Sequence, residues 1–167
     1  MNFEIKAGCE RPEEIKEIFN EYTSMLVESD PSFAAYLDIQ KYDDEIEHPE
    51  KKYAQPDGLL LRAYSDGKLA GCIAYRRIDS ENCEMKRLYV RPAFRGQKIA
   101  SILLEMLIDA AKFYGYRYML LDTLPFLRIA IGMYRKAGFY EIQSYNNSPM
   151  KTSIFMKLDL QKERETT

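Results

Sequence analysis

Residues 83–100 have the sequence CEMKRLYVRPAFRGQKIA, and the other predicted elements can be placed outward from them. Their pattern predicts a strand, a short turn that contains a proline, and the beginning of a long helix. The free backbone N–H groups at a helix start normally recruit a Ser, Thr, Asp or Asn side chain, and none stands here. Because Arg95 and Lys98 stand there instead, the natural acceptor is an anion from outside the chain. We therefore expect a phosphate-bearing ligand at residues 95–100.

The chain before this segment contains both strand and helix patterns. Alternation with period two predicts strands, and apolar residues at three- and four-residue steps predict helices. The Asp66-Gly67 pair marks a tight hairpin between two of the strands. In chain order we expect a strand at 2–7, helices at 12–28 and near 33–39, a polar loop at 42–58 with room for a helical turn, and strands at 59–64, 69–78 and 83–90.

The chain after it predicts two helices that alternate with strands. We expect a helix at 96–114, a strand at 116–122, a helix at 126–137, and strands at 139–144 and 153–159. A helical crossover makes the strand at 116–122 parallel to the strand at 83–90. The element order is β-α-α-β-β-β-α-β-α-β-β. It predicts an α/β (α+β) fold with a mixed, mostly antiparallel sheet of about seven strands, whose central parallel pair splays into a ligand cleft.

Composition limits the class of protein. The 167 residues predict a single domain over 1–160 and a polar, frayed tail at 161–167. A net charge of −2 argues against general binding to nucleic acid, and no apolar run is long enough to span a membrane. The N-terminus lacks the pattern of a signal peptide, so we expect a cytoplasmic protein. Three widely spaced cysteines fit neither a disulfide framework nor a metal site: Cys9, Cys72 and Cys83.

An apolar stripe on the helix at 96–114 should hold the helix start rigidly against the sheet. Glu105, Asp109 and Lys112 lie outside this stripe. A basic loop that merely solvates the helix start would explain residues 95–100 as well as an anion site does. The stripe consists of Ile99, Ile102, Leu103, Met106, Leu107, Ala110 and Tyr114.

The segment from 84 to about 142 resembles the GCN5-related N-acetyltransferase (GNAT) superfamily. The superfamily signature Arg/Gln-x-x-Gly-x-Gly/Ala is similar to residues 95–100, RGQKIA, except that lysine replaces the usual glycine. A second signature, a helix ending Tyr-x-x-x-Gly-Phe, is similar to residues 130–139, AIGMYRKAGF. The segments 86–92 and 121–125 resemble one common bacterial branch. Each piece is weak alone, but their order and spacing together are specific.

The resemblance implies acetyl-coenzyme A (acetyl-CoA) as cofactor. Its pyrophosphate would lie on the backbone amides of residues 96–101, and its pantetheine arm would add to the strand at 88–90 by backbone hydrogen bonds. The amide of Leu88 would polarise the thioester carbonyl. The predicted cofactor-binding residues are Leu88, Tyr89, Val90, Arg95, Gly96, Gln97, Lys98, Ile99, Ala100, Ser101 and Leu127.

Two residues depart from the family pattern. Lys98 stands where a glycine allows close backbone approach to phosphate, although a lysine there can keep its amide on the anion and add a charge. Leu127 stands where many relatives carry an Asn that faces the cofactor. We expect coenzyme A binding to be retained.

Acyl transfer to an amine needs one proton removed from the ammonium and one given to the departing thiolate. By resemblance, Tyr134 corresponds to the general acid, and Glu84 stands where some histone-acetylating relatives have their base. Strand alternation predicts that Glu84 shares a face with Lys86 and Leu88. The alternatives are a packed aromatic for Tyr134 and an exposed, ion-paired carboxylate for Glu84.

Other charged residues are less specific. Arg76, Arg77, Lys86 and Arg87 could hold an anionic group of the acceptor or simply be solvated. The acidic run 43–45 favours a solvated face, and the single histidine, His48, favours a surface residue over a catalytic base.

The sequence thus predicts an N-acetyltransferase that moves an acetyl group to a primary amine of a small molecule or peptide by direct attack in a ternary complex. One alternative is a degenerate acyl-CoA sensor or regulatory module, and another is an interaction domain that binds no coenzyme A. Many members of the superfamily are homodimers, so a homodimer is one expected assembly.

Overall fold

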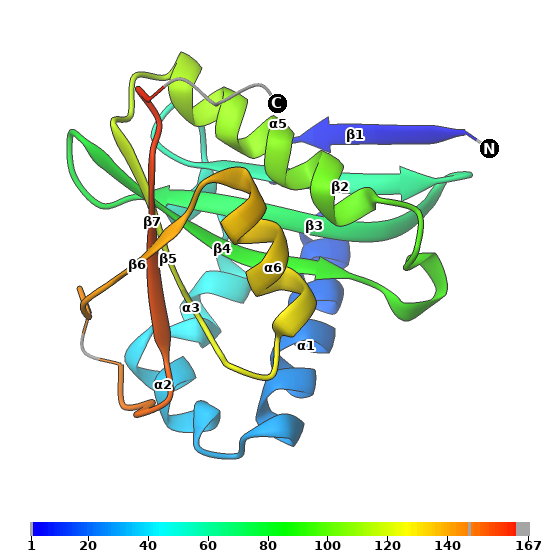
Figure 1. Cartoon of the computed structure of the whole chain (residues 1–167). Helices are drawn as coiled ribbons and strands as arrows, with labels where there is room; N and C mark the ends of the chain where they lie inside the picture. The colour runs from blue at the N-terminus through cyan, green and yellow to red at the C-terminus, as the bar shows by residue number, and fades with distance from the viewer. Residues whose placement is uncertain (1, 147, 163–167) are drawn as a thin grey trace.

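The computed structural model describes residues 2–146 and 148–162. It contains one seven-stranded sheet in the order β1-β2-β3-β4-β5-β7-β6 (Figure 1). Only β4 and β5 pair in parallel, and the other neighbours are antiparallel. The predicted fold class and strand number are therefore confirmed. That residues 1–160 form one domain stays a prediction, and most of the tail predicted to fray lies outside the described residues.

The first part of the chain builds the sheet edge and a layer of helices. The hairpin between β2 and β3 turns at Asp66 and Gly67, whose φ angles of 50° and 78° match the predicted Asp-Gly turn. The elements are β1 (Phe3–Ala7), α1 (Pro12–Ser29), α2 (Phe33–Ile39), α3 (Tyr42–Glu47), α4 (Glu50–Tyr53), β2 (Leu59–Ser65), β3 (Lys68–Arg77) and β4 (Asn82–Val90).

The prediction of a loop at 42–58 is wrong in its first part, which forms the short helices α3 and α4. The prediction of a solvated acidic face is also wrong for Glu45, which is buried. Its carboxylate accepts a hydrogen bond from Arg87 at 2.7 Å and another from Lys52 at 2.8 Å. Because Arg87 lies 42 residues away along the chain, local polarity did not reveal this pairing.

The second part of the chain supplies the parallel strand and the helices of the other face. Helix α6 ends at Ala137, as predicted, and Gly138 follows it in the left-handed region at a φ of 110°. The elements are a 3-10 turn (Pro92–Phe94), α5 (Ile99–Phe113), β5 (Tyr118–Thr123), α6 (Arg128–Ala137), β6 (Tyr140–Ile142) and β7 (Ile154–Asp159).

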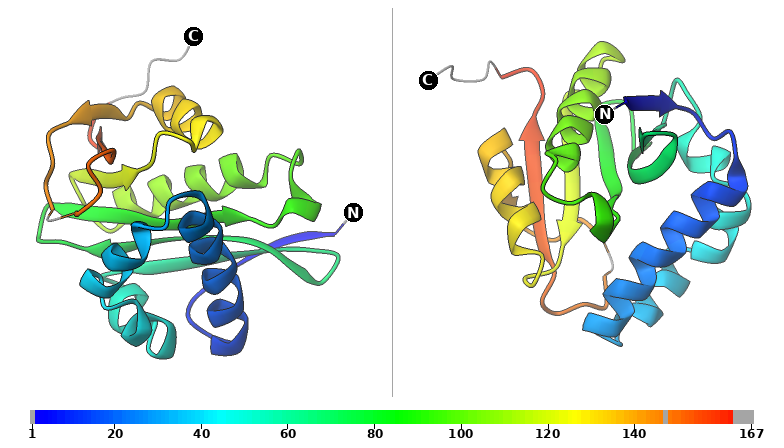
Figure 2. Two further views of the ribbon diagram at one scale, coloured as in Figure 1. Left: turned by 90° about the horizontal axis from the view of Figure 1, so that it is seen from below. Right: turned by 90° about the vertical axis from the view of Figure 1, so that its right-hand side faces the viewer.

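Helices cover both faces of the sheet. Figure 2 shows α5 and α6 on one face and α1 to α4 on the other. The larger apolar core lies under α5 and includes Leu103, Leu107 and Met119. A second core lies under α1 and includes Ile18 and Phe19. The central strands are therefore buried on both faces. Among residues 2–146 and 148–162, no helix combines the length and apolar character needed to cross a bilayer.

The predicted stripe of α5 is only partly right. Ile99, Leu103 and Leu107 are buried as expected, but Ile102 and Met106 are exposed. The buried face instead continues through further residues, namely Leu104, Ile108 and Ala111. The helix is apolar on most of its circumference, so the sequence did not determine which stripe meets the sheet.

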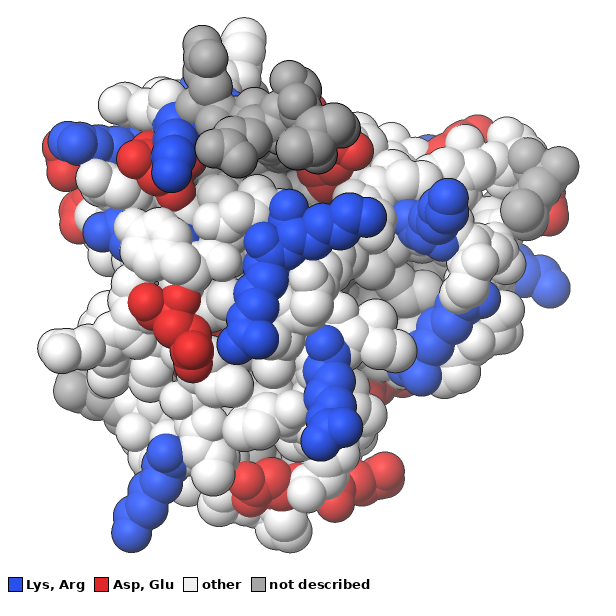
Figure 3. Space-filling model, viewed as in Figure 1, with Lys and Arg blue, Asp and Glu red and all other residues white. Residues whose placement is uncertain are grey.

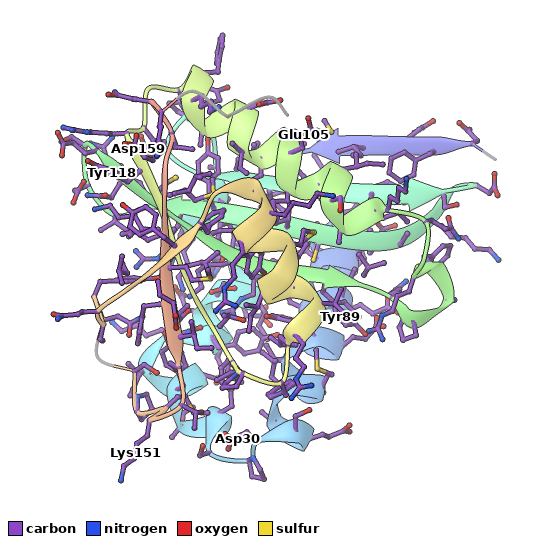
Figure 4. All side chains as sticks on the ribbon, viewed as in Figure 1. Asp30, Tyr89, Glu105, Tyr118, Lys151 and Asp159 are labelled. Atoms are coloured by element: carbon purple, nitrogen blue, oxygen red, sulfur yellow. The ribbon has the colours of Figure 1, made fainter. Side chains whose placement is uncertain are left out.

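The parallel pair separates along its length. β4 and β5 pair only at three positions, the last of which joins Glu84 to Leu120. Beyond that pair, the residues toward the carboxyl ends of β4 and β5 do not pair with one another. Figure 4 labels Tyr118 and Asp159 near the closed end of this pair and Tyr89 near the other end of β4. The sheet is thus split in the middle, as the sequence predicts.

A bulge in β4 changes which side chains face the split. Arg87 has a φ of 63°, and the register between β3 and β4 shifts at this point. As a result, Leu88 packs with the α5 core, together with Met85. The prediction that Glu84 and Leu88 share a face is therefore wrong, because the extra residue reverses the alternation between them.

Candidate active site

A pocket lies where the sheet splits. Its wall combines residues of the strands β4 and β5 with residues of α1, α2 and α6. Helices α1 and α2 cover one face of the sheet, and α6 covers the other (Figure 2). It is a cleft that opens to solvent, with polar and apolar side chains in its wall. The residues that carry its chemistry are Tyr36, Lys86, Arg87, Asp122 and Tyr134.

The start of α5 offers donors to an anion. Arg95 donates its backbone N–H to Pro92, and Ile102 donates its own to Lys98. Between them, no acceptor within the described chain is recorded for the amides of residues 96–101. No side chain caps the helix either. These amides, together with the helix dipole, are donors able to hold a phosphate group, and the phosphate site stays a prediction.

The two unusual residues of this loop adopt left-handed backbone. Gly96 has a φ of 82°, and a Cβ there would meet nothing within 4 Å, so the surface above it is open. Lys98, the residue before α5, has a φ of 62°. This conformation explains why a glycine suits the position, and a lysine there accepts some backbone strain.

Positive charge gathers around this helix start. Figure 3 shows Lys and Arg side chains over the region of α6 and the loop before α5. Lys98 and Arg95 come from that loop. Arg95 also donates from Nε to the carbonyl oxygen of Val90 at 3.1 Å, which ties the loop to the end of β4. The residues therefore fit a polyanion such as a pyrophosphate.

At the end of β4, the side chains pack into the two cores, so the backbone edge of the strand faces the split. Leu88 and Val90 turn their side chains into the α5 core. Tyr89 is buried on the other side, against Tyr22, with ring centroids 5.6 Å apart. A ligand that entered the split would therefore meet the strand edge, which is the arrangement needed for added backbone pairing.

Tyr134 reaches the pocket from α6. Its side chain is buried, and its hydroxyl group has no hydrogen bond to another described residue. Burial raises the pKa of this phenol, and the nearby Tyr22 adds to the effect. The group therefore stays protonated at neutral pH and is able to donate a proton or a hydrogen bond.

Glu84 is committed to neighbouring side chains. It is buried, accepts a hydrogen bond from Nε of Arg76 at 2.8 Å, and accepts another from the hydroxyl of Tyr145 at 2.6 Å. Burial raises its pKa, but Lys86, Arg76 and Tyr145 outweigh burial and lower the pKa below its usual value. It does not belong to the pocket wall. The prediction that it acts as a base is not tested, but this geometry gives it little support.

Asp122 is a pocket carboxylate that the sequence analysis did not select. It lies at the carboxyl end of β5, and its Oδ2 accepts hydrogen bonds from Tyr36 and, at 3.2 Å, from Asn146. The second oxygen has no partner recorded among the described residues. The available signal was its position, because it is the only charged residue in the strand Tyr118–Thr123 and stands at its ligand end.

The four predicted cations separate into different environments. Arg87 is paired with Glu45, Arg76 with Glu84, and Arg77 with Asp57. Lys86 lines the pocket, and its nearest carboxylate oxygen, on Glu84, is 4.0 Å away. Of these four cations, Lys86 therefore lines the pocket with the most distant carboxylate partner among the described residues.

Of the remaining candidate residues that the structure describes, only Leu127 belongs to the pocket wall. It stands at the start of α6. His48 is exposed beside Glu50, as expected for a surface residue. Cys72 and Cys83 are buried thiols, whereas Cys9 is partly exposed. In the described ranges, no group of His, Cys, Asp and Glu could hold a metal ion.

Known proteins share this sequence pattern and this fold. The family model described as "Acetyltransferase (GNAT) family" matches residues 13–139. An uncharacterized N-acetyltransferase of Schizosaccharomyces pombe is 34% identical over 145 residues, which cover 86% of this chain and 89% of the relative.

Solved structures agree with the fold. A GNAT-family acetyltransferase from Staphylococcus aureus has a TM-score of 0.75 at 19% identity, covering 96% of this chain and 100% of the other. The paia N-acetyltransferase from Thermoplasma acidophilum, solved in complex with coenzyme A, has a TM-score of 0.70 at 22% identity and covers 95% of this chain and 99% of the other.

Proposed function

The chain belongs to the GNAT family of acetyltransferases, and from this premise we propose that it moves the acetyl group of acetyl-CoA to a primary amine bound in the pocket. The acceptor is an amine of a small molecule or a peptide, and it attacks directly while both substrates are bound. The observation that carries the proposal is the split between β4 and β5, because the pocket wall takes residues from both strands at this point.

Acetyl-CoA is the cofactor, and when bound it supplies an activated acetyl group. We assign its pyrophosphate to the amides of residues 96–101, with Lys98 and Arg95 as added charges. The edge of β4 at residues 88–90 holds the pantetheine arm through backbone hydrogen bonds. The N–H of Leu88 donates to the carbonyl oxygen of the thioester, where negative charge develops during transfer.

The pocket residues handle the protons. The open oxygen of Asp122 accepts a hydrogen bond from the acceptor ammonium, orients it, and takes its surplus proton on the way to solvent. The new bond joins nitrogen to the acetyl carbon as the carbon–sulfur bond breaks. Tyr134 gives its hydroxyl proton to the departing sulfur and regains a proton from solvent.

Glu84 has a positioning role in this proposal. Its hydrogen bonds connect β4 to Arg76 on β3 and to Tyr145 in the segment between β6 and β7. These contacts hold Lys86 and the segment near Asp122 in place. The base function expected from the resemblance stays a prediction, as do the cytoplasmic location and the homodimer.

The test compares Tyr134→Phe with the unchanged protein. We expect kcat for thiol release to fall about 100-fold or more, while the Kd for acetyl-CoA measured by calorimetry changes less than about threefold. The matched control is Tyr140→Phe, because Tyr140 is an exposed tyrosine on β6. Full turnover by Tyr134→Phe would contradict its role as general acid. A protein that binds acetyl-CoA but releases no thiol with any amine would instead be the sensor alternative.

A further inference from the structure

The charge of Lys86 is the unexplained feature of the pocket. Its side chain is only 9% exposed, and its ammonium group makes no hydrogen bond to any residue in the described ranges. The nearest carboxylate, on Glu84, already serves Arg76 and Tyr145. Burial of a cation whose nearest carboxylate is 4.0 Å away and already shared is costly, so a ligand that supplies a closer anion would bind with an advantage.

Lys86 stands opposite Asp122 across the split. The last paired residues of the two strands are Glu84 and Leu120. Two residues further along each strand, on the same face, come Lys86 and Asp122. Both line the pocket, yet no ion pair within 4.0 Å joins them. The pocket therefore presents one cation and one anion that are held apart on its two sides.

From this juxtaposition we infer that the acceptor is an amine that also carries a carboxylate, such as an α- or ω-amino acid with a free carboxyl group. Lys86 binds the carboxylate, and Asp122 binds the amine. A single lysine ammonium balances one negative charge, which favours a carboxylate over a phosphate dianion. This inference rests on the proposed function and names the substrate class of the same site.

The rest of the wall agrees with an amino acid of modest size. Tyr36 from α2, Gln40 directly after α2, and Thr123 from β5 add polar groups to the same wall. Leu26 and Phe33 add apolar surface for the carbon chain between the acceptor's amine and carboxylate. Since Arg87 is bound by Glu45, Lys86 is the cation left for the carboxylate.

The experiment uses matched acceptor pairs at saturating acetyl-CoA. Each of the common α-amino acids and each ω-amino acid from β-alanine to 6-aminohexanoate is compared with its primary amide and with the amine that lacks the carboxyl group. Thiol release gives kcat/KM for each compound. We expect the acid of the preferred pair to exceed its amide by about 10- to 100-fold, mostly through KM.

Three variants then locate the effect. Lys86→Met should reduce the acid-over-amide ratio to about one, and Lys86→Arg should keep part of it because the charge remains. Lys112→Met, which removes an exposed lysine of α5, is the matched control and should keep the ratio of the unchanged protein. As a measurement that needs no variant, short alkanoic acids should compete with the acceptor and their amides should not.

The outcomes separate the two proposals. Amides or plain amines that are acetylated as well as the acids would overturn the inference and leave the acetyltransferase function standing. An acid preference that survives in Lys86→Met would also overturn it, because the carboxylate would then bind elsewhere. No turnover of any amine in the panel would contradict the proposed function itself.

Discussion

Lys98 carries both a strained backbone and a charge at the same point of the site. Its φ of 62° costs an L-residue about 1 kcal/mol more than glycine, and its side chain stands at the helix start that we assign to pyrophosphate. We predict that Lys98→Gly raises the free energy of unfolding by about 1 kcal/mol and weakens acetyl-CoA binding, with a smaller salt dependence of Kd. Urea unfolding and calorimetry at two salt concentrations measure the two effects.

Two further variants separate strain from charge. Lys98→Ala removes the charge but keeps an L-residue in the left-handed region, so it should weaken binding without the gain in stability. Gly96→Ala should lower stability by about 1 kcal/mol, because Gly96 has a φ of 82° even though its Cβ would meet no atom. A Lys98→Gly protein no more stable than Lys98→Ala would show that the loop relaxes and stores no strain.

Lys86 predicts a pH dependence for acceptor choice. Burial, and then the guanidinium of Arg87, lower the pKa of Lys86 to about 8. Below this pH the ammonium is charged and binds a carboxylate, and above it the charge is lost. The acid-over-amide ratio of kcat/KM should therefore fall as pH rises through about 8. The charged groups that face Lys86 are Glu84 and Arg87 on β4, Glu45 on α3, Lys52 on α4, Arg76 on β3 behind Glu84, and Asp122 on β5.

The amine of the acceptor also titrates, so the acid-over-amide ratio of kcat/KM must be corrected for the protonation of the substrate. Dividing it by the ratio for Lys86→Met at each pH removes the part that belongs to the substrate. Lys86→Arg should keep its preference for the acid to higher pH, because guanidinium stays charged. A corrected ratio that does not change between pH 6 and about 9.5 would contradict the assignment of the carboxylate to Lys86.

At the scale of single residues, the sequence predicted those that belong to a local motif. Tyr134 and the loop at 95–100 lie in short signatures, Tyr134 lines the pocket, and the roles of both stay predictions. Asp122 and Tyr36 were missed because their hydrogen bond joins segments 86 residues apart. Leu88 was assigned to the wrong face because the bulge at Arg87 has no clear signal in one sequence.

Among the elements, α3 is held to the sheet by one buried ion pair. Glu45 accepts two hydrogen bonds from Arg87, and both side chains are almost fully buried. We predict that Glu45→Gln lowers the free energy of unfolding by about 3 kcal/mol, because it leaves the buried guanidinium without its counter-charge. The neighbouring exposed residue gives the matched control, Asp43→Asn, which should change stability by less than about 0.5 kcal/mol.

The same pair predicts how stability depends on pH. Burial would raise the pKa of Glu45, but the charge and hydrogen bonds of Arg87 outweigh it and lower the pKa far below its usual range. The stabilisation is therefore complete above the ordinary carboxyl pKa of about 4.5 and is lost as pH falls below it. Unfolding measured from pH 7 to about 3 should show a steeper loss for the unchanged protein than for Glu45→Gln. Parallel curves would contradict the assignment.

The elements that the sequence predicted well are those with strong local signals. The hairpin at Asp66-Gly67 and the helix end at Gly138 need only local backbone conformations, and both were found. The helices at 42–53 were missed because they are short and polar, and each buries only a few residues, among them Tyr42, Glu45 and Tyr53. The buried face of α5 was only partly found because much of its surface is apolar.

At the scale of the whole molecule, element order was enough to predict the split sheet. A helical crossover between β4 and β5 requires a parallel pair, and the antiparallel hairpins account for most of the remaining pairings. The composition of the pocket could not be predicted in the same way. It depends on the register of β4 against β5. It also depends on side chains of α1 and α2, which lie on the face of the sheet away from α6 (Figure 2).

The split also predicts where the molecule responds to its cofactor. The amides of residues 96–101 have no acceptor within the described chain, so they should exchange hydrogen rapidly in the free protein. Adding coenzyme A should slow them about tenfold or more at short labelling times, together with the edge of β4 at residues 88–90. Amides of the β1–β2 pair, which lies far along the sheet order from β5, should keep their rates at these times. Binding also stabilises the fold as a whole, but that effect slows only amides that exchange through global unfolding. The fast amides therefore report local contact, and protection that spared residues 96–101 would contradict the pyrophosphate site at the start of α5.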